Sequence, residues 1–247
     1  DEVFRVYWPN DLEVDVDGVH YEARAPLAAI WSIHGVDGYS QLKPQLYEHL
    51  WRKLPRERVL ELLNTRYVVA NTEEAPWPQG SLVFSSTDLS VYRTATYVPR
   101  AFVVPRCRAV QIQEAFDILA QPSFDVSREV LLSDVTSSSL PPAWPEEARG
   151  HAEITDYRYE SIELSVHMPY RGVLVLSEPY FPGWRCEVDG RRVDIHRADA
   201  ILRAVILPSG NHAVTFTYSP ASVCLGAIVS LGALLFSALF CVKDMRS

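Results

Sequence analysis

The last stretch of the sequence, residues 221–242, carries no charged side chain and consists almost entirely of apolar and small residues. A helix rises about 1.5 Å per residue, so this run forms a helix of about 33 Å, enough to cross the hydrocarbon core of a bilayer. A helix buried in a soluble core is rarely apolar on every face over such a length. The run therefore predicts one C-terminal transmembrane helix.

The charges beside this helix predict which side of the membrane the rest of the chain occupies. Lys243 and Arg246 follow the run directly, whereas residues 208–220 contain no Lys or Arg. The positive-inside rule places a short tail, residues 243–247, in the cytoplasm and the main part of the chain outside it. Because no basic and apolar leader opens the chain, we expect further transmembrane segments of a longer protein to precede it. Membrane lipid and those other transmembrane helices are its expected partners.

The net charge and the cysteines exclude several classes of function. The 247-residue chain has a formal net charge of −8, which argues against nucleic acid as a partner. Outside the apolar run, Cys107 and Cys186 have no CxxC motif or histidine pair beside them, so we expect no metal site. No hydrolase or nucleotide-binding motif occurs either, and no cofactor is expected. In an oxidising compartment the two cysteines either pair in one disulfide or remain thiols.

Residues 1–134 mix helical and strand-like patterns and predict an α+β domain. Apolar residues recur at helical spacing in residues 42–50 and 56–63. Residues 4–8 are predicted to pair in a first hairpin with the stretch after Asp17-Gly18. Four β-branched and aromatic runs predict a small sheet, residues 66–70, 81–86, 89–94 and 100–104.

The segment at residues 135–150 is rich in Ser, Pro and Glu and predicts a linker, or alternatively a surface loop within one domain. Residues 151–218 then alternate apolar and polar positions in short segments, which is typical of a β-sandwich. Asp189-Gly190 is the clearest tight turn, because both residues tolerate a positive φ. The predicted fold is thus an α+β N-terminal region, a mostly antiparallel β-sandwich and one C-terminal transmembrane helix.

Several motifs occur in a specific order: LLNTRYVV at residues 62–69, PRAFVV at 99–104, LVLSEPYFPGWRCEVDG at 174–190 and VTFTYSP at 214–220. Together they resemble the YfhO-like bacterial membrane proteins, which are regarded as GT-C-type glycosyltransferases with many transmembrane helices. The resemblance implies a cell-membrane protein with a large extracytoplasmic portion. It also implies a catalytic carboxylate in a first extracytoplasmic loop, outside this chain, so no catalytic residue is assigned here. One departure is Asp199, where the family pattern more often has Asn.

Aromatic residues beside carboxylates suit sugars, because a flat ring stacks on a pyranose while carboxylates accept hydrogen bonds from its hydroxyls. Tyr180, Phe181, Trp184, Glu178 and Asp189 form such a group in the sequence. The alternative interpretation is structural and is the favoured one. In it, Trp184 belongs to the sandwich core and Asp189 only turns the hairpin.

Three further residues are candidates for substrate binding. Asp37 and Tyr39 follow an irregular stretch containing His34, so they could lie on a loop that faces a membrane active site, or form an ordinary Asp-Gly turn. Arg100 could bind the phosphate of a lipid-linked sugar through its forked donors. Alternatively, it pairs with a carboxylate across the sheet, which we favour.

The sequence therefore leads to two hypotheses of function. In the first, the chain is the extracytoplasmic part of a polytopic glycosyltransferase that transfers a sugar from a polyprenyl-phosphate donor to a cell-envelope polymer, and this part shapes the acceptor side. In the second, it is a membrane-anchored carbohydrate-binding or envelope-assembly module without catalysis. In either case carbohydrate, free or lipid-linked, is the expected ligand.

Overall fold

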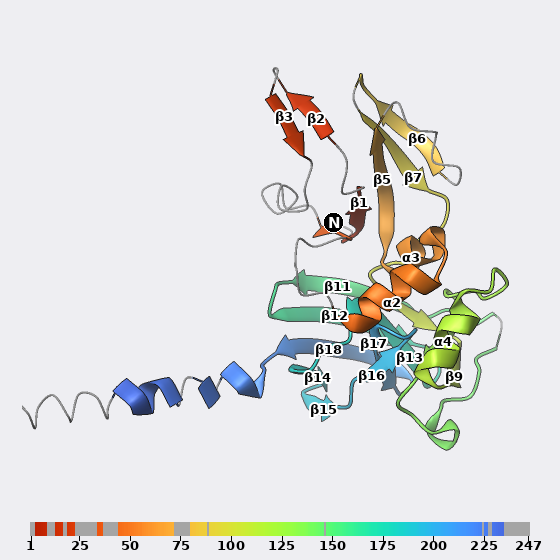
Figure 1. The fold of residues 1–247 in the computed structure, drawn as a ribbon. Coiled ribbons are helices and arrows are strands. Elements are labelled where there is room, and N and C mark those ends of the chain that lie inside the picture. Colours follow the sequence, from red (N-terminus) through yellow and green to blue (C-terminus); the bar gives the residue numbers. More distant parts are fainter. Residues whose placement is uncertain are drawn as a thin grey trace, which may run out of the picture.

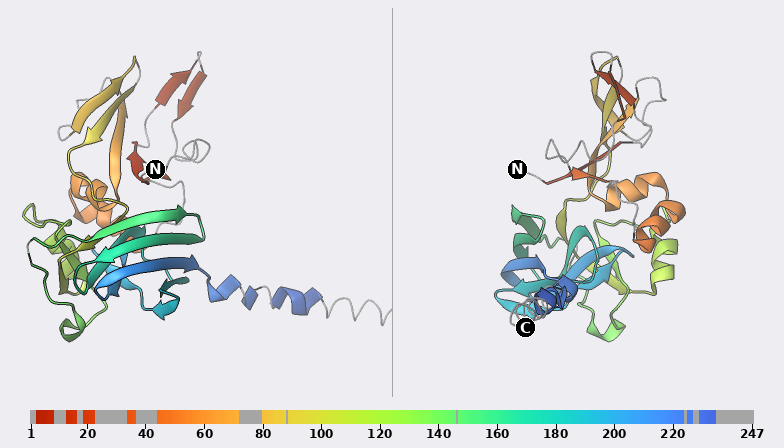
Figure 2. Two further views of the ribbon diagram at one scale, coloured as in Figure 1. Left: turned by 180° about the vertical axis from the view of Figure 1, so that it is seen from behind. Right: turned by 60° about the vertical axis from the view of Figure 1, so that its left-hand side comes forward.

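A computed structural model shows a layered body, a smaller sheet standing on it, and a C-terminal helical segment that leads away from it (Figure 1). Two further views show the same arrangement (Figure 2). The structure describes residues 3–8, 13–16, 19–22, 34–36, 44–71, 80–87, 89–145, 147–223, 225–226 and 229–234.

The body is built on a six-stranded mixed sheet, which we call the central sheet. Its antiparallel part contains β8 (Ala101–Val104), β13 (Gly172–Pro179), β17 (Leu202–Leu207) and β16 (His196–Ala198), and it continues through β10 (Glu129–Leu132) to the parallel strand β9 (Arg106–Ala109). The sheet thus takes strands from both sides of residues 135–150, which contain a short 3₁₀ helix, Ser137–Ser139. The predicted grouping of residues 100–104 with the small sheet is wrong, because β8 pairs with β13 instead.

The central sheet is covered on both faces, and its side chains alternate between two cores. Val173 and Val175 of β13 point into one core, whereas Leu174 and Leu176 point into the other. Successive side chains of a strand lie on opposite faces, so a strand covered on both sides must be apolar at almost every position. All the residues of β13 from Gly172 to Glu178 are buried accordingly.

Three helices cover one face of the central sheet: α2 (Gln45–Lys53), α3 (Arg56–Leu62) and α4 (Ile112–Leu119). Their buried residues, including Leu50, Leu60 and Phe116, pack in the core that Val173 and Val175 also enter. Pro44 and Pro55 precede the first two helices, where the missing N–H of proline costs no helical hydrogen bond. The helices predicted near residues 42–50 and 56–63 are thus confirmed.

A five-stranded antiparallel sheet covers the opposite face. Its order is β11 (His151–Tyr157), β12 (Ser161–Met168), β18 (Gly210–Tyr218), β14 (Trp184–Val188) and β15 (Arg191–Val193). Met168, Cys186 and Phe216 fill the core between this sheet and the central sheet. The prediction of a mostly β chain with helices in its first part is confirmed.

The third sheet has the order β4 (His34–Gly35), β1 (Arg5–Tyr7), β5 (Thr65–Asn71), β7 (Leu89–Thr94) and β6 (Gly80–Ser85). β1 pairs in parallel with both β4 and β5. The predicted pairing of residues 4–8 in a hairpin is therefore wrong. The hairpin that does form joins β2 (Glu13–Val16) to β3 (Val19–Glu22), which follows Asp17-Gly18 as expected.

The predicted transmembrane run is described only in part. Residues 221–223, 225–226 and 229–234 are helical, and the large side chains described there, from Val223 to Leu234, are exposed. Residues 235–247, which include the rest of the run and the predicted cytoplasmic tail, lie outside the described residues. Within the part that is described, no helix is long and apolar enough to cross a membrane, so the transmembrane helix stays a prediction.

Candidate functional site

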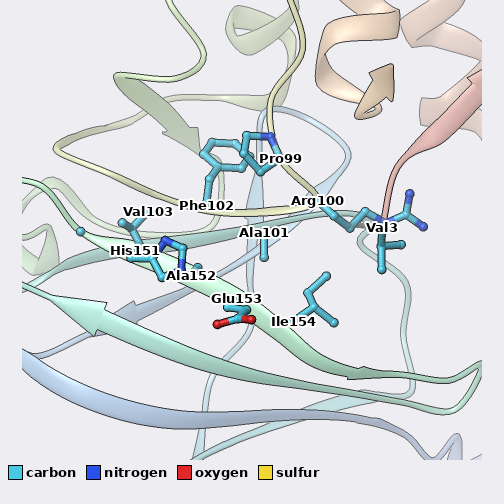
Figure 3. A pocket seen from close by; sticks show the side chains of 11 residues that line it. Val3, Pro99, Arg100, Ala101, Phe102, Val103, His151, Ala152, Glu153 and Ile154 are labelled. Atoms are coloured by element: carbon cyan, nitrogen blue, oxygen red, sulfur yellow. The ribbon is translucent and has the colours of Figure 1, made fainter. Parts of the chain in front are cut away.

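A groove of about 590 Å³ lies along the edges of two sheets. One wall is β8, which lies at one edge of the central sheet as far as the sheet is described. The other wall is β11, which lies in the same way at an edge of the antiparallel sheet. Figure 3 shows Arg100 beside Val3 at one end of the groove, with Val103 and His151 toward the other. The volume is within the range of small-molecule sites, which is about 300–1,000 Å³.

The backbone of β8 presents polar groups to this groove. Ser177 of β13 donates its N–H to the carbonyl of Arg100 at 2.8 Å. Peptide groups alternate in direction along an antiparallel ladder, so Ala101 and Val103 turn theirs away from β13 and toward the groove. An edge of this kind offers donors and acceptors in a fixed row, which suits a ligand rich in hydroxyl groups.

Side chains of both signs line the groove. His151 and Glu153 are exposed on β11, and Arg100 is buried at the end of β8. A Cβ atom at Gly150 would collide with Val103 and would come within 3.0 Å of the Trp144 ring. Glycine at this position therefore allows the chain before β11 to approach β8 closely enough to form the groove.

Behind the groove lies a buried group of charges that we call the Glu178 cluster: Glu178, Arg5, Arg100, Arg203 and Tyr157. Arg100 Nη2 lies 2.7 Å from Oε1 of Glu178, whereas Arg5 and Arg203 lie 3.3 and 3.7 Å from Oε2. Tyr157 donates its hydroxyl to Oε1 at 2.6 Å and accepts a hydrogen bond from Arg100 at 2.7 Å. One carboxylate thus joins residues from all three large sheets.

The cluster holds three guanidinium groups around one carboxylate, and other contacts stabilise the excess positive charge. Arg203 stacks on the Trp184 ring with 3.9 Å between Cζ and the ring centroid, a cation–π contact that favours a buried cation. Arg5 donates to two backbone carbonyls at 2.9 and 2.8 Å. Among the described residues, Nε and Nη1 of both Arg100 and Arg203 are buried without a hydrogen-bond partner.

Burial and neighbouring charge act in opposite directions on the pKa values of the cluster. Burial alone would raise the pKa of Glu178, but Arg5, Arg100 and Arg203 together lower it to about 2. Burial lowers the pKa of Arg203 to about 10, against the attraction of Glu178. Burial and the adjacent Glu178 carboxylate raise the pKa of Tyr157. At neutral pH the carboxylate is therefore ionised and Tyr157 keeps its proton.

Of the predicted binding residues that the structure describes, Arg100 is the one that lines the groove. It also pairs with Glu178 of the neighbouring strand, which is the favoured of the two sequence interpretations. Tyr180 and Phe181 line a separate pocket of about 200 Å³ against α2. There the Arg197 guanidinium lies 4.4 Å from the centre of the Tyr180 ring.

Trp184 and Asp189 lie at opposite ends of β14. Trp184 is half-buried and packs against the core between the sheets, with its ring 5.3 Å from that of Tyr218. Asp189 adopts φ 51° in the turn before β15. It accepts hydrogen bonds from the Ala213 N–H at 2.9 Å and pairs with His212 at 2.7 Å. Hydrogen bonds from His212 and Ala213 lower the pKa of Asp189. The structure thus does not bring these two residues together.

Asp37 and Tyr39 lie outside the described residues. Cys107 and Cys186 are free thiols, and burial raises their pKa to about 11 and 12. In the described part of the chain no group of His, Cys, Asp and Glu could hold a metal ion.

Several residues of the site were not singled out from the sequence: Arg5, Tyr157, Arg203, His151 and Glu153. Arg203 follows Leu202 and precedes two apolar residues in a buried strand. A charge at an inward position of such a strand is a usable signal, because an interior charge requires a partner.

The fold and the groove define a β-rich protein with an open groove at the edges of two packed sheets. Residues 130–230 match the family described as bacterial membrane protein YfhO. This match confirms the resemblance inferred from the sequence motifs and supports membrane association. It covers β11, one wall of the groove, but not β8. No curated protein and no solved structure matches the chain.

Proposed function

We propose that the chain is the extracytoplasmic part of a membrane glycosyltransferase and that the groove between β8 and β11 holds the acceptor. In this proposal the sugar comes from a polyprenyl-phosphate donor and is transferred to a cell-envelope polymer. The observation that carries the assignment of the ligand is the groove itself, which is lined by the backbone of β8 and by the side chains of Arg100, His151 and Glu153. This arrangement suits a carbohydrate, whose hydroxyls both donate and accept hydrogen bonds.

The membrane part of the proposal is supported by the YfhO match and by the C-terminal helical segment. That segment leaves the end of β18 and exposes Val223, Leu225, Val229, Leu231 and Leu234. A row of exposed large apolar side chains is unfavourable in water and favourable in a bilayer. We propose that it anchors the groove outside the cytoplasm, with the C-terminus on the cytoplasmic side, and packs against other transmembrane helices.

The proposal is tested by transfer of sugar from the polyprenyl-phosphate donor to isolated envelope polymer, catalysed by the full-length membrane protein. We expect Glu153→Gln to raise KM for the acceptor about tenfold, without a matching change in KM for the donor, because Glu153 lines the acceptor groove. Glu163→Gln is the matched control, since Glu163 is exposed on β12 and does not line the groove.

Deletion of residues 1–218 tests the same idea at the level of the whole region. Transfer should be lost without them, and full activity of the truncated protein would refute the proposal. The alternative function is a carbohydrate-binding or assembly module without catalysis. It predicts that glycan binding responds to Glu153→Gln while no transfer by the protein is detected.

A further inference from the structure

The antiparallel sheet has two ends, and the C-terminal helical segment leaves it at one of them (Figure 1). β18, the middle strand, ends at Tyr218, which pairs with Trp184, the first residue of β14. On the other side of β18, Thr217 pairs with Ser161, the first residue of β12. The loops that precede β12 and β14 therefore lie on either side of the chain where it passes into the helical segment. We call this end of the sheet the exit end.

Backbone hydrogen bonds fasten both loops to the departing chain. In the turn between β11 and β12, the carbonyl of Glu160 accepts the N–H of Tyr218 at 2.7 Å. In the loop between β13 and β14, the carbonyl of Gly183 accepts the N–H of Ser219 at 2.8 Å. Gly183 has φ 104°, and a Cβ atom there would meet the Tyr218 ring at 2.9 Å and Pro220 at 3.0 Å. The glycine thus allows this loop to lie directly against the start of the helical segment.

Each of the two loops carries an exposed aromatic side chain. Tyr159 is 93% exposed and Phe181 is 50% exposed. A single exposed aromatic residue is ordinary on a protein surface, but these two flank the start of a segment whose large described side chains, in residues 223–234, are exposed as well. Trp184 and Tyr218 lie half-buried at the same end, with 5.3 Å between their ring centres. The exit end therefore gathers four aromatic residues around the departing chain.

The two loops carry no excess of positive charge. Arg158 and Glu160 flank Tyr159, and Arg158 pairs with Asp156 at 2.7 Å. Residues 180–183 carry no charge, and the chain as a whole has a net charge of −8. The exit end is therefore not suited to attract an anionic surface. Aromatic rings, in contrast, are favoured at the boundary between lipid headgroups and acyl chains, whatever the charge of the lipid.

We propose that the exit end rests on the lipid bilayer, with Tyr159 and Phe181 inserted in its interfacial layer on either side of the anchor. This inference rests on the part of the proposed function that makes the C-terminal segment a membrane anchor. A helix alone leaves the body free to tilt about the point where the chain enters the membrane. Two inserted side chains in hydrogen-bonded loops beside that point restrict the tilt.

The same contact orients the groove. β11 lines the groove from His151 to Ile154 and then continues to the turn that carries Tyr159. The end of the groove at Arg100 therefore faces the membrane, and the end at His151 faces away from it (Figure 3). A donor held in the membrane approaches the groove from the Arg100 end, whereas a long acceptor polymer extends from the other end.

The test uses the unmodified full chain in vesicles of phosphatidylcholine with a small share of a phospholipid that carries a photoreactive diazirine near its glycerol backbone. Mass spectrometry identifies the crosslinked peptides. We expect crosslinks in the loops of Tyr159 and Phe181 and in residues 221–234, but not at Tyr170. Tyr170 is the matched control, because it is 48% exposed and follows β12 at the other end of the same sheet.

A double variant, Tyr159→Ser with Phe181→Ser, tests whether the two rings hold the loops at the membrane. Crosslinks to the remaining residues of the two loops should fall at least about threefold, because the interfacial preference lies in the rings. Crosslinks in residues 221–234 should persist and serve as the internal standard. Tyr170→Ser should change neither set.

The possible failures are distinguishable. Crosslinks in residues 221–234 without any in the two loops, or equal yields at Tyr170 and Tyr159, would overturn this inference and leave the anchor intact. Loop crosslinks that the double variant leaves unchanged would overturn it as well. Absence of crosslinks from residues 221–234 would contradict the anchor itself, and this inference with it. The transfer assay with Glu153→Gln tests the acceptor groove, and its outcome does not depend on these crosslinks.

Discussion

The Glu178 cluster and a surface cavity lined by Arg106, Arg128 and Arg149 each gather three arginines, but the two sets differ in burial. In the cluster the guanidinium groups are buried, and all three lie within 3.7 Å of one carboxylate. In the cavity all three arginine residues are exposed. Removing a charge from water is costly unless a partner compensates it. Burial therefore makes the first set a structural element, whereas the second set keeps its contact with water and contributes little to stability.

The largest expected effect is that of Glu178→Gln, which keeps the shape of the side chain and removes the only carboxylate of the cluster. Three buried cations would then repel one another, and we expect the free energy of unfolding to fall by about 3–5 kcal/mol. Chemical denaturation of the solubilised chain measures this loss, with Glu163→Gln as the control. An unchanged midpoint would show that the cluster is not structural.

The pH dependence of the free energy of unfolding, measured for the wild type and for Glu178→Gln, gives a second test of the cluster. The pKa of Glu178 is about 2 in the folded protein and 4.5 in its ordinary state, so the stabilisation is complete above pH 4.5. It is lost as the pH falls toward 2. The wild type should lose this stability on acidification, and Glu178→Gln should lack that part of the loss.

The second expected effect concerns Asp199, a fully buried carboxylate in the core beneath the helices. Its Oδ1 accepts the N–H of Leu131 at 3.0 Å, while Oδ2 is buried without a partner among the described residues. Burial raises its pKa to about 7, although the Leu131 hydrogen bond opposes this. A raised pKa means that the folded state binds the proton more tightly, so stability from this group is present below about pH 4 and is lost as the pH rises through 7.

Asp199→Asn removes the charge and keeps the acceptor for Leu131. We expect it to stabilise the protein by on the order of 2–4 kcal/mol at pH 8, with the difference shrinking toward pH 4. Thermal unfolding of both proteins at several pH values measures this. A variant that is equally or less stable at pH 8 would mean that Asp199 has an ionic partner in the folded protein.

Trp184→Ala is expected to have the third-largest effect, because it removes the ring on which Arg203 stacks. Trp184 is half-buried, so we expect a loss of roughly 2–3 kcal/mol, somewhat below the about 3–5 kcal/mol of a fully buried aromatic. Denaturation measures the loss, and glycan binding is the discriminating control. A stable variant that has lost affinity for sugar would identify Trp184 as a ligand platform instead.

Asp189→Ala should destabilise less than Trp184→Ala, because the side chain is exposed and the fold loses only its hydrogen bonds to Ala213 and His212. Asp189→Asn is the matched control, since Asn tolerates the same positive φ. The melting temperature should fall slightly for Ala and less for Asn. Equal losses would show that the carboxylate charge matters more than the turn.

The smallest expected effect on stability is that of Arg106→Gln, which should change the free energy of unfolding by less than about 0.5 kcal/mol. Denaturation beside Glu178→Gln measures the contrast between the two arginine settings. A loss comparable to that of Glu178→Gln would mean that the arginines of the surface cavity also stabilise the fold.

Local patterns predicted much of the secondary structure but not the partners of the strands. The helices near residues 42–50 and 56–63 follow from apolar spacing and from Pro55. The apolar run of β8 predicts a strand, yet it does not say which strand lies beside it. Its pairing with β13 is a long-range contact that no local pattern contains. The parallel pairing of β1 was missed for the same reason.

The groove and the Glu178 cluster were also predictable only in part, because the sequence shows the residue types but not their neighbours in space. The sequence offered a carboxylate partner for Arg100 as one of two alternatives, because forked donors suit either role. It could not show that the partner is Glu178, since Glu178 was grouped with nearby aromatics on the basis of sequence distance. His151 and Glu153 look like ordinary solvent-facing residues of a strand, and only the neighbouring edge of β8 makes them part of a groove.

The strand order of the central sheet also determines when folding can finish during synthesis. β8 ends at Val104, but its neighbour β13 begins at Gly172, and β17, the next strand, ends at Leu207. Until those residues leave the ribosome, the sheet that α2, α3 and α4 cover lacks its two central strands, and part of the helices' apolar surface stays exposed. Long-range strand pairing is slow, and exposed apolar surface promotes aggregation. Nascent chains that stop before β17 are therefore expected to require a chaperone, whereas chains that include β18 complete both cores at once.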